Sequence, residues 1–520
     1  MKLACVAPHN DGQLGEIVER ALRRSFTADQ VVRFEPGKLA PALGGVQALV
    51  LCNPEDALAP AVAAWLTAGG AKLAVFGAVG PRLARILGIA AEPLGEALAQ
   101  HAGCAPAAVG GHAESALALR YSGQGLGAAS PVAERPLCRY DFAAEWNNLG
   151  YGPVRADGSI WALAHRARAA GAQVVASVVH GAESVSAFAT VRDTETWSAL
   201  WINRAVGMVD SAEWRLVEHF FVHYRPQQLA CLSMVSEIPF GWDAAVTMRL
   251  DCDEDAASAA ALLRRYREER VPLSLAITTR LLAEPRHCDF AREVAAGGGS
   301  LLSHSVTHPV NWGGSYEHAL REARESREAL LPLAADVRYA VSPFHQNPLY
   351  AVRAMADAGY DGFVGGIVAN DPEYLIGRSG EVPGGGAGFV SHSQQCMLHG
   401  DCMLAEGDPL RLYTESFAIA RRARSLFGYL DHPFSDRYQY GWHSEEQRLR
   451  MHGELIGRIR SGGRVLFLSE NDALDFLRAR GAARFRSRER GFALEVPAAR
   501  AGAFAVEHRG TVVEAGGAGT

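Results

Sequence analysis

The chain has 520 residues, more than one ordinary domain, so two or three domains are expected. Its formal net charge is −6, from 51 basic and 57 acidic residues, and no basic run is interleaved with aromatic residues, which argues against a nucleic-acid partner. No stretch approaches the roughly 18 uninterrupted apolar residues of a membrane span, and the apolar run at the start is too short for a secretory leader. The nine cysteines are scattered and odd in number, which fits reduced thiols. We therefore expect a soluble, cytoplasmic protein.

Residues 1–225 alternate strand-like and helical runs. The predicted elements are a strand at 2–7, a helix at 12–25, strands at 46–51 and 72–76 with a helix at 59–68 between them, a strand at 199–203 and a helix at 211–224. Strands that alternate with helices at this spacing predict a parallel sheet in an α/β layer. A stretch between these groups is rich in Gly and Ala and then becomes more β-like.

The order of these elements loosely resembles the class I glutamine-amidotransferase-like, flavodoxin-type domain. Such a domain carries its nucleophile in the turn that here follows Phe76. That turn reads Gly77-Ala78-Val79-Gly80 and contains no cysteine. We expect the domain to be non-catalytic and to serve as a binding module or scaffold.

Residues 226–482 repeat a strand and a helix about seven times. The predicted strands are 244–250, 273–277, 300–303, 338–341, 362–364, 428–430 and 465–468. A β/α unit repeated without doubling back predicts a barrel of seven or eight units, in which the C-terminal strand ends carry the chemistry. Asp251, His304, Pro343 and His432 all fall at or just beyond such ends.

Two carboxylates, Asp251 and Asp253, close the first of these strands. Successive side chains of a strand alternate between its two sides, so both carboxylates point the same way. This placement is costly unless a cation or a shared proton compensates the repulsion, and it is a first indication of a metal. Cys252 between them is interpreted as a packing residue, and Asp255 as the N-cap of the next helix.

His304 and His308 lie four residues apart, so one helical turn would place both imidazoles on one face, able to hold one ion. With Asp253 they would supply three protein ligands and leave positions open for water and substrate, as in a catalytic site. These ligands favour zinc, with cobalt or nickel as alternatives. Asp251 could then accept a proton from water, and a histidine on the far side could protonate a departing amine.

Residues 241–480 resemble the polysaccharide deacetylase (NodB-homology) superfamily, whose members are metal-dependent and have a distorted (β/α) barrel. The matching motifs are Asp251-Cys252-Asp253, His304-Ser305-Val306-Thr307-His308 and Leu430-Asp431-His432-Pro433. The resemblance implies that Asp251 is the general base and His432 the general acid. It also implies that Asp253, His304 and His308 hold the metal.

The third motif of that superfamily usually has an arginine shortly before a proline, and the matching segment here, residues 339–348, has none. Arg249, two residues before Asp251 and on the same side of the strand, could replace that charge, although an ordinary ion pair in the barrel wall would explain it as well. Arg249 is also a candidate substrate contact. By analogy with the family, the backbone N–H of Phe344 is expected to stabilise the oxyanion.

Four further side chains are candidate contacts to a sugar. His392 and Gln394 lie in a polar stretch near the expected barrel mouth, where their hydrogen bonds suit sugar hydroxyls, although an ordinary surface hairpin is the competing interpretation. Trp312 and Trp442 follow the motif histidines and could stack on sugar rings or belong to the core.

These residues predict a metal-dependent amide hydrolase that removes acetyl groups from an N-acetylated sugar in a polysaccharide or glycolipid precursor. A deformylase or small-molecule amidase of the same superfamily is one alternative, and a carbohydrate-binding protein with an idle site is another. The expected architecture is a flavodoxin-like α/β domain at 1–225, a catalytic distorted (β/α) barrel at 226–482 and a short β-rich segment at 483–520. The sequence does not predict the oligomeric state.

Overall fold

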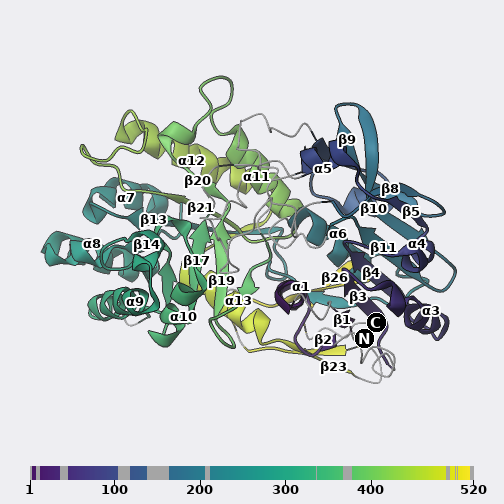
Figure 1. Cartoon of the computed structure of the whole chain (residues 1–520). Helices are drawn as coiled ribbons and strands as arrows, with labels where there is room; N and C mark the ends of the chain where they lie inside the picture. Colours follow the sequence, from purple (N-terminus) through teal and green to yellow (C-terminus); the bar gives the residue numbers. More distant parts are fainter. Residues whose placement is uncertain are drawn as a thin grey trace.

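The structure is a computed structural model. It describes residues 3–6, 12–34, 45–102, 117–137, 163–204, 211–334, 336–366, 370, 377–487, 492–497, 499 and 502–515. Figure 1 shows two α/β lobes side by side, the N-terminal lobe in purple and blue and the second lobe in teal and green. No helix among the described residues is long and apolar enough to cross a bilayer.

The N-terminal sheet has nine strands in the order β2-β1-β3-β4-β11-β10-β9-β6-β7. The strands are β1 (Leu3–Val6), β2 (Val31–Phe34), β3 (Ala48–Cys52), β4 (Lys72–Phe76), β6 (Leu117–Tyr121), β7 (Glu134–Pro136), β9 (Gln173–His180), β10 (Glu183–Asp193) and β11 (Ser198–Ile202). Parallel pairs join the first five strands of this order, and antiparallel pairs join the rest. The predicted parallel α/β layer is confirmed.

Five helices accompany this sheet in the described residues, and β5 (Ile89–Glu92) and β8 (Arg166–Ala169) form a separate antiparallel pair. The helices are α1 (Gly12–Ser25), α3 (Ala59–Thr67), α4 (Pro81–Leu87), α5 (Glu96–Ala102) and α6 (Ser211–Val222). Helix α4 begins at a proline, whose fixed φ suits a first turn, and ends at Gly88, which has a left-handed φ of 69°.

The second lobe contains a ten-stranded sheet in the order β18-β19-β17-β16-β15-β14-β13-β21-β20, with β22 also paired to β13. The strands are β13 (Ala244–Cys252), β14 (Ser274–Ile277), β15 (Leu301–Ser303), β16 (Tyr339–Val341), β17 (Gly362–Gly366), β18 (Gly380–Glu381), β19 (Val390–Gln394), β20 (Cys396–Met397), β21 (Phe427–Asp431) and β22 (Val465–Leu468). Every pair is parallel except β18 with β19.

Helices follow most of these strands. They are α7 (Ala260–Glu268), α8 (Pro285–Ala296), α9 (Tyr316–Leu330), α10 (Leu349–Asp357), α11 (Arg411–Arg422), α12 (Glu445–Ser461) and α13 (Glu470–Gly481). Side-chain oxygens of Ser315, Ser444 and Ser469 cap α9, α12 and α13 by accepting a backbone N–H. Asp255 caps the short 3-10 helix Ala256–Ala259 before α7, as predicted.

The prediction of a closed barrel is not confirmed, because the described strands form an open path of pairs. That path ends at β18 and β20. However, β19 and β20 belong to one bent segment, which pairs with β17 on one side and with β21 on the other. Between them, the Gln395 backbone N–H donates to the Gly428 carbonyl at 2.7 Å. The sheet therefore curls back toward β13 through residues 390–397.

Strand β13 lies at the centre of this lobe, because β14, β21 and β22 all pair with it. All nine of its residues are buried. Burial raises the pKa of the Cys252 thiol well above its usual value, which fits a packing residue. Since parallel strands end on one edge of a sheet, the residues that follow β13, β15, β16 and β21 lie on that edge.

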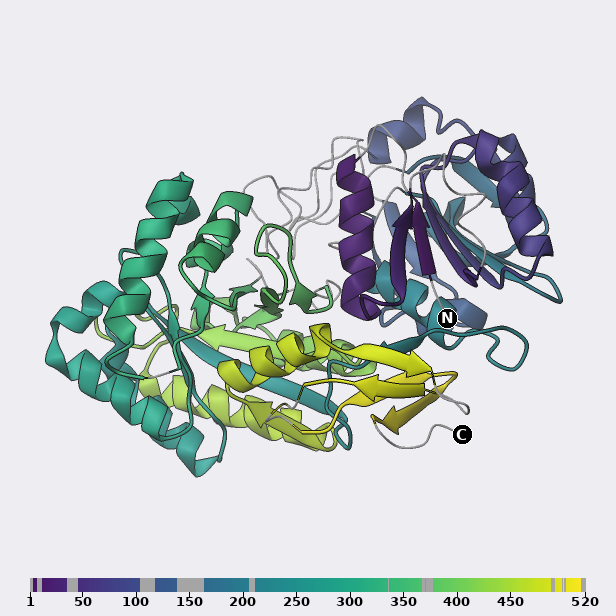
Figure 2. The same ribbon diagram turned by 90° about the horizontal axis from the view of Figure 1, so that it is seen from below.

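The C-terminal residues form two antiparallel pairs, β23 (Arg484–Ser487) with β24 (Phe492–Glu495) and β25 (Ala505–His508) with β26 (Thr511–Glu514). Strand β25 also pairs with β12 (Ser233–Val235). Figure 2 shows these yellow strands reaching from the second lobe toward the N-terminal lobe. In agreement, the Arg509 backbone N–H donates to the Val222 carbonyl at the end of α6.

A buried ion network connects the two lobes. Glu218 on α6 accepts hydrogen bonds from Arg378 at 2.9 and 3.0 Å and from Arg215 at 2.8 Å. Arg378 also donates to the carbonyls of Ala423 and Arg424 just after α11. The side chains of Glu218, Arg378 and Arg215 are all buried. The contact between the lobes therefore depends on these ion pairs, because an unpaired buried charge is energetically costly.

Replacing Arg378 by Met should lower the free energy of unfolding by about 3 kcal/mol, because Glu218 would stay buried with two hydrogen bonds fewer. Urea unfolding followed by circular dichroism measures this. The control is Arg353→Met, which removes an exposed pair with Asp357 and should change stability by less than about 0.5 kcal/mol. Equal unfolding midpoints for the two variants would contradict the role given to this network.

Candidate active site

The two histidines of the H-x-x-x-H motif lie in a turn that follows β15, so the expected helical turn is wrong. Ser305 and His308 have left-handed φ values of 65° and 57°. The hydroxyl of Ser303 accepts the Ser305 N–H, and the hydroxyl of Ser305 accepts the His308 N–H at 2.9 Å. Glu322 on α9 accepts two further backbone N–H groups of the turn. These hydrogen bonds hold the turn so that the centroids of the His304 and His308 rings lie 4.6 Å apart.

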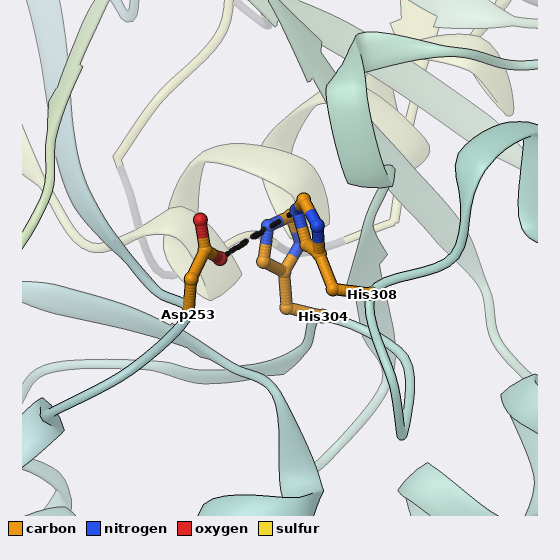
Figure 3. Close-up of side chains that lie close together, drawn as sticks. All are labelled: Asp253, His304 and His308. Atoms are coloured by element: carbon orange, nitrogen blue, oxygen red, sulfur yellow. Dashed lines mark ion pairs between the residues drawn. The ribbon is translucent and has the colours of Figure 1, made fainter.

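Asp253, His304 and His308 come together as predicted, and Figure 3 shows the carboxylate directed at both rings. The Asp253 Oδ1 atom lies 3.3 Å from His304 Nε2 and 3.5 Å from His308 Nε2. The three candidate ligand atoms all lie within 4.8 Å of one another. This spacing allows the three side chains to hold one ion.

The surroundings of these residues fit a divalent cation. The Asp253 Oδ1 atom is buried, and it has no hydrogen-bond partner within the described part of the chain. His304 Nδ1 donates to the Val341 carbonyl at 3.0 Å, so its Nε2 lone pair is free to face Asp253, which is the usual arrangement of a metal-binding histidine. One carboxylate and two imidazoles are also the ligands of many catalytic zinc sites.

The local charges favour a cation at the same place. Burial lowers the pKa of His304, but Asp251 and Asp253 outweigh it and raise that pKa above its usual value. Burial and then the neighbouring His304 lower the pKa of His308 to about 4, so His308 is neutral near pH 7. The carboxylates thus stabilise one positive charge between them, which a proton or a metal ion can supply.

Asp251 lies outside the group of three possible ligands, because Arg249 holds its carboxylate. Arg249 Nε donates to Oδ1 at 2.6 Å and a terminal nitrogen donates to Oδ2 at 3.1 Å. Arg249 also donates to the Gly365 carbonyl at 3.2 Å. Burial alone would raise the pKa of Asp251, but the charge of Arg249 holds it below its usual range. Arg249 therefore supplies a positive charge to Asp251, and its side chain is fully buried.

His432 follows β21 and faces the other oxygen of Asp253, with its Nε2 3.4 Å from Oδ2. Its Nδ1 lies 2.8 Å from His399 Nε2, and the Tyr440 ring stacks on it at a centroid distance of 4.1 Å. The sequence did not single out His399 or Tyr440 for this site, because both lie in loops that match no motif. The signal for His399 was that it belongs to the same polar stretch as His392, residues 391–402.

The loop after β16 contributes two residues to the edge of the site. Phe344 has a left-handed φ of 54° and an exposed ring, which lies 4.5 Å from the His308 ring. The next residue, His345, was not predicted from the sequence to lie near the site. Burial and then the charge of Arg249 lower its pKa to about 3, so it is neutral. A side chain at Gly366 would collide with the His345 ring, so the two residues pack closely.

The four other candidate substrate contacts are engaged inside the fold, which corrects the expectation that they face a sugar. Trp312 and Trp442 are buried and present no open ring face. His392 and Gln394 are also buried, and both contact Glu470 on α13, at 2.7 and 2.5 Å. The exposed apolar side chains near the site are instead Val310, Phe344 and Leu349, in and after the loops that follow β15 and β16.

No protein-family model and no curated protein matches the chain. Among solved structures, the carbohydrate deacetylase Agd3 aligns with 99% of this chain and 91% of its own, at 10% identity and a TM-score of 0.40. A family 4 carbohydrate esterase from Bacillus anthracis aligns with 46% of this chain and 86% of its own, at 13% identity and a TM-score of 0.30. A family 4 acetyl xylan esterase from Clostridium thermocellum, solved with cobalt, aligns with 44% of this chain and 89% of its own, at 12% identity and a TM-score of 0.30. These solved structures, to which the chain is similar, are carbohydrate deacetylases or esterases.

We expect the wild-type protein to bind one zinc or cobalt ion per chain, measured by competition with a chromophoric chelator. Asp253→Ala should weaken binding by about 100-fold or more, because loss of a ligand should exceed the loss of an outer hydrogen-bond partner. The control is His443→Ala, since His443 is exposed and lies outside the group of three. Equal affinities of Asp253→Ala and His443→Ala would show that the ion binds elsewhere.

Proposed function

We propose that the chain is a metal-dependent hydrolase that removes the acetyl group from an N-acetylated sugar. The observation that carries this proposal is the division between the two aspartates at the end of β13. Asp253 faces two imidazoles, whereas Asp251 is held by Arg249. A site with one carboxylate for a cation and a second, ionised carboxylate beside it suits the activation of water.

In this proposal each residue has one task. A cation held by Asp253, His304 and His308, with zinc favoured over cobalt or nickel, would polarise the amide carbonyl and lower the pKa of the attacking water. Asp251 accepts the proton of that water, and its two hydrogen bonds to Arg249 keep the carboxylate ionised and oriented.

The departing nitrogen needs a proton, because an amine anion is a poor leaving group. His432 gives this proton from Nε2, the nitrogen that faces Asp253. The backbone N–H of Phe344 stabilises the negative charge that develops on the carbonyl oxygen. These roles assign a base at the end of β13, an acid just after β21 and an oxyanion donor in the loop after β16, all on one edge of the sheet.

The substrate is a sugar within a polysaccharide or glycolipid precursor. The exposed ring of Phe344 beside His308 supports this, because an aromatic face suits the apolar face of a sugar ring. In this proposal the 226–482 domain is catalytic, and its open, curled sheet takes the place of the barrel that the sequence resemblance implies. The 1–225 domain is a non-catalytic scaffold whose parallel strand order β2-β1-β3-β4-β11 suits a flavodoxin-like sheet. Residues 483–520 form an additional β-rich segment.

Incubation of the zinc- or cobalt-loaded protein with N-acetylated sugar oligomers should release acetate. Asp251→Asn should lower kcat by roughly 10²- to 10⁴-fold, because a neutral amide cannot accept the proton of water. Chelation should abolish turnover and added metal should restore it, whereas His443→Ala should match the wild type.

Three results would contradict this proposal. Equal rates for Asp251→Asn and the wild type would exclude Asp251 as the base. Sugar binding without acetate release by the metal-loaded protein would instead favour a carbohydrate-binding protein, and hydrolysis of N-formyl but not N-acetyl substrates would favour a deformylase.

A further inference from the structure

The contact between His399 and His432 is built into the loops that carry them. The Gly400 backbone N–H donates to the Tyr440 carbonyl at 2.9 Å. A side chain at Gly400 would collide with the backbone of Gly441, so the two loops pack closely. His399 is buried, and the His399 and His432 rings lie 4.8 Å apart. The close packing of the two loop backbones therefore holds the His399 and His432 side chains next to each other.

Only one hydrogen can lie between His399 Nε2 and His432 Nδ1 at 2.8 Å, so one nitrogen donates and the other accepts. The other nitrogen of His399, Nδ1, lies 3.9 Å from the Asp401 carboxylate. That negative charge favours a hydrogen on His399 Nδ1, which leaves Nε2 as the acceptor. His432 then carries the shared hydrogen on Nδ1.

Other features keep His399 in the accepting form. Burial and then the nearby His432 lower the pKa of His399 to about 4, so it stays neutral near pH 7. Asp431 approaches His399 Nε2 only to 4.0 Å. The Asp431 Oδ1 atom that faces His399 accepts the Trp442 Nε1–H at 3.4 Å, and its Oδ2 accepts from Arg448 at 2.7 Å and from His452 at 2.9 Å.

We propose that His399 is a positioning residue that accepts the Nδ1–H of His432 and so directs His432 Nε2 toward the substrate nitrogen. The chemical consequence rests on the proposed function. As the C–N bond breaks, the bonding electron pair stays on nitrogen and the proton moves there from His432 Nε2. The Nδ1–H remains on His432, which ends neutral, so His399 gains and loses no proton.

Two substitutions separate this role from simple packing. His399→Phe keeps a ring of similar shape but removes the acceptor, whereas His399→Gln can accept through its amide oxygen. We expect His399→Phe to lower kcat by roughly 10- to 100-fold with KM changed less than about 2-fold, as for other outer partners that orient functional histidines. His399→Gln should recover part of this loss, and His443→Ala should match the wild type.

Nitrogen NMR of the full-length, zinc-loaded protein with ¹⁵N-labelled histidine tests the hydrogen bond without substrate. The His432 signals are assigned by their loss in His432→Gln. We expect His432 Nδ1 to be protonated in the wild type and to become a mixture of tautomers in His399→Phe. An unprotonated Nδ1 in the wild type, or a wild-type kcat in His399→Phe, would overturn the proposal. If the wild type releases no acetate, the proposed function fails, but the NMR result still decides the role of His399.

Discussion

The ion pair between Arg249 and Asp251 is the interaction on which the site depends. Asp251 and Asp253 end one strand on the same side, and two free carboxylates there would repel each other. Arg249 lies two residues earlier on that side and binds both oxygens of Asp251, in a fully buried position. This pairing leaves Asp253 as the carboxylate that faces His304 and His308. Like charges in adjacent positions can therefore take different tasks.

The fold supports this division through the central position of β13. Its neighbours β14 and β21 place their own ends on the same edge of the sheet, and β21 leads directly to His432. Remote residues hold the loops of that edge: Glu322 on α9 supports the turn between the two motif histidines, and Val341 at the end of β16 orients His304. The N-terminal lobe contributes no residue to the group of three possible ligands and meets the second lobe through buried charges such as Glu218 and Arg378. The candidate site and the contact between lobes thus rest on separate buried ion pairs.

The sequence predicted the features that depend on local pattern. Strand and helix periods gave the β/α order, and the alternation of side chains along β13 predicted that Arg249, Asp251 and Asp253 share a side. Prediction from the sequence failed where contacts between residues far apart in the chain determine the structure. The turn at Ser305 and His308 depends on positive φ values and on Glu322, which spacing alone does not reveal. Glu470 holds His392 and Gln394 inside the fold, and the burial of Trp312 and Trp442 likewise depends on tertiary packing. His399 meets His432 across two loops, which no motif encodes.

Anomalous diffraction at the zinc edge from crystals of the zinc-loaded protein tests the central claim most directly. The division between the aspartates predicts one peak within about 2.0–2.2 Å of the Asp253 carboxylate and of the Nε2 atoms of His304 and His308. Asp251 should remain bound to Arg249 in the same crystals. A peak bonded to Asp251, or the absence of a peak between the three predicted ligands, would contradict it.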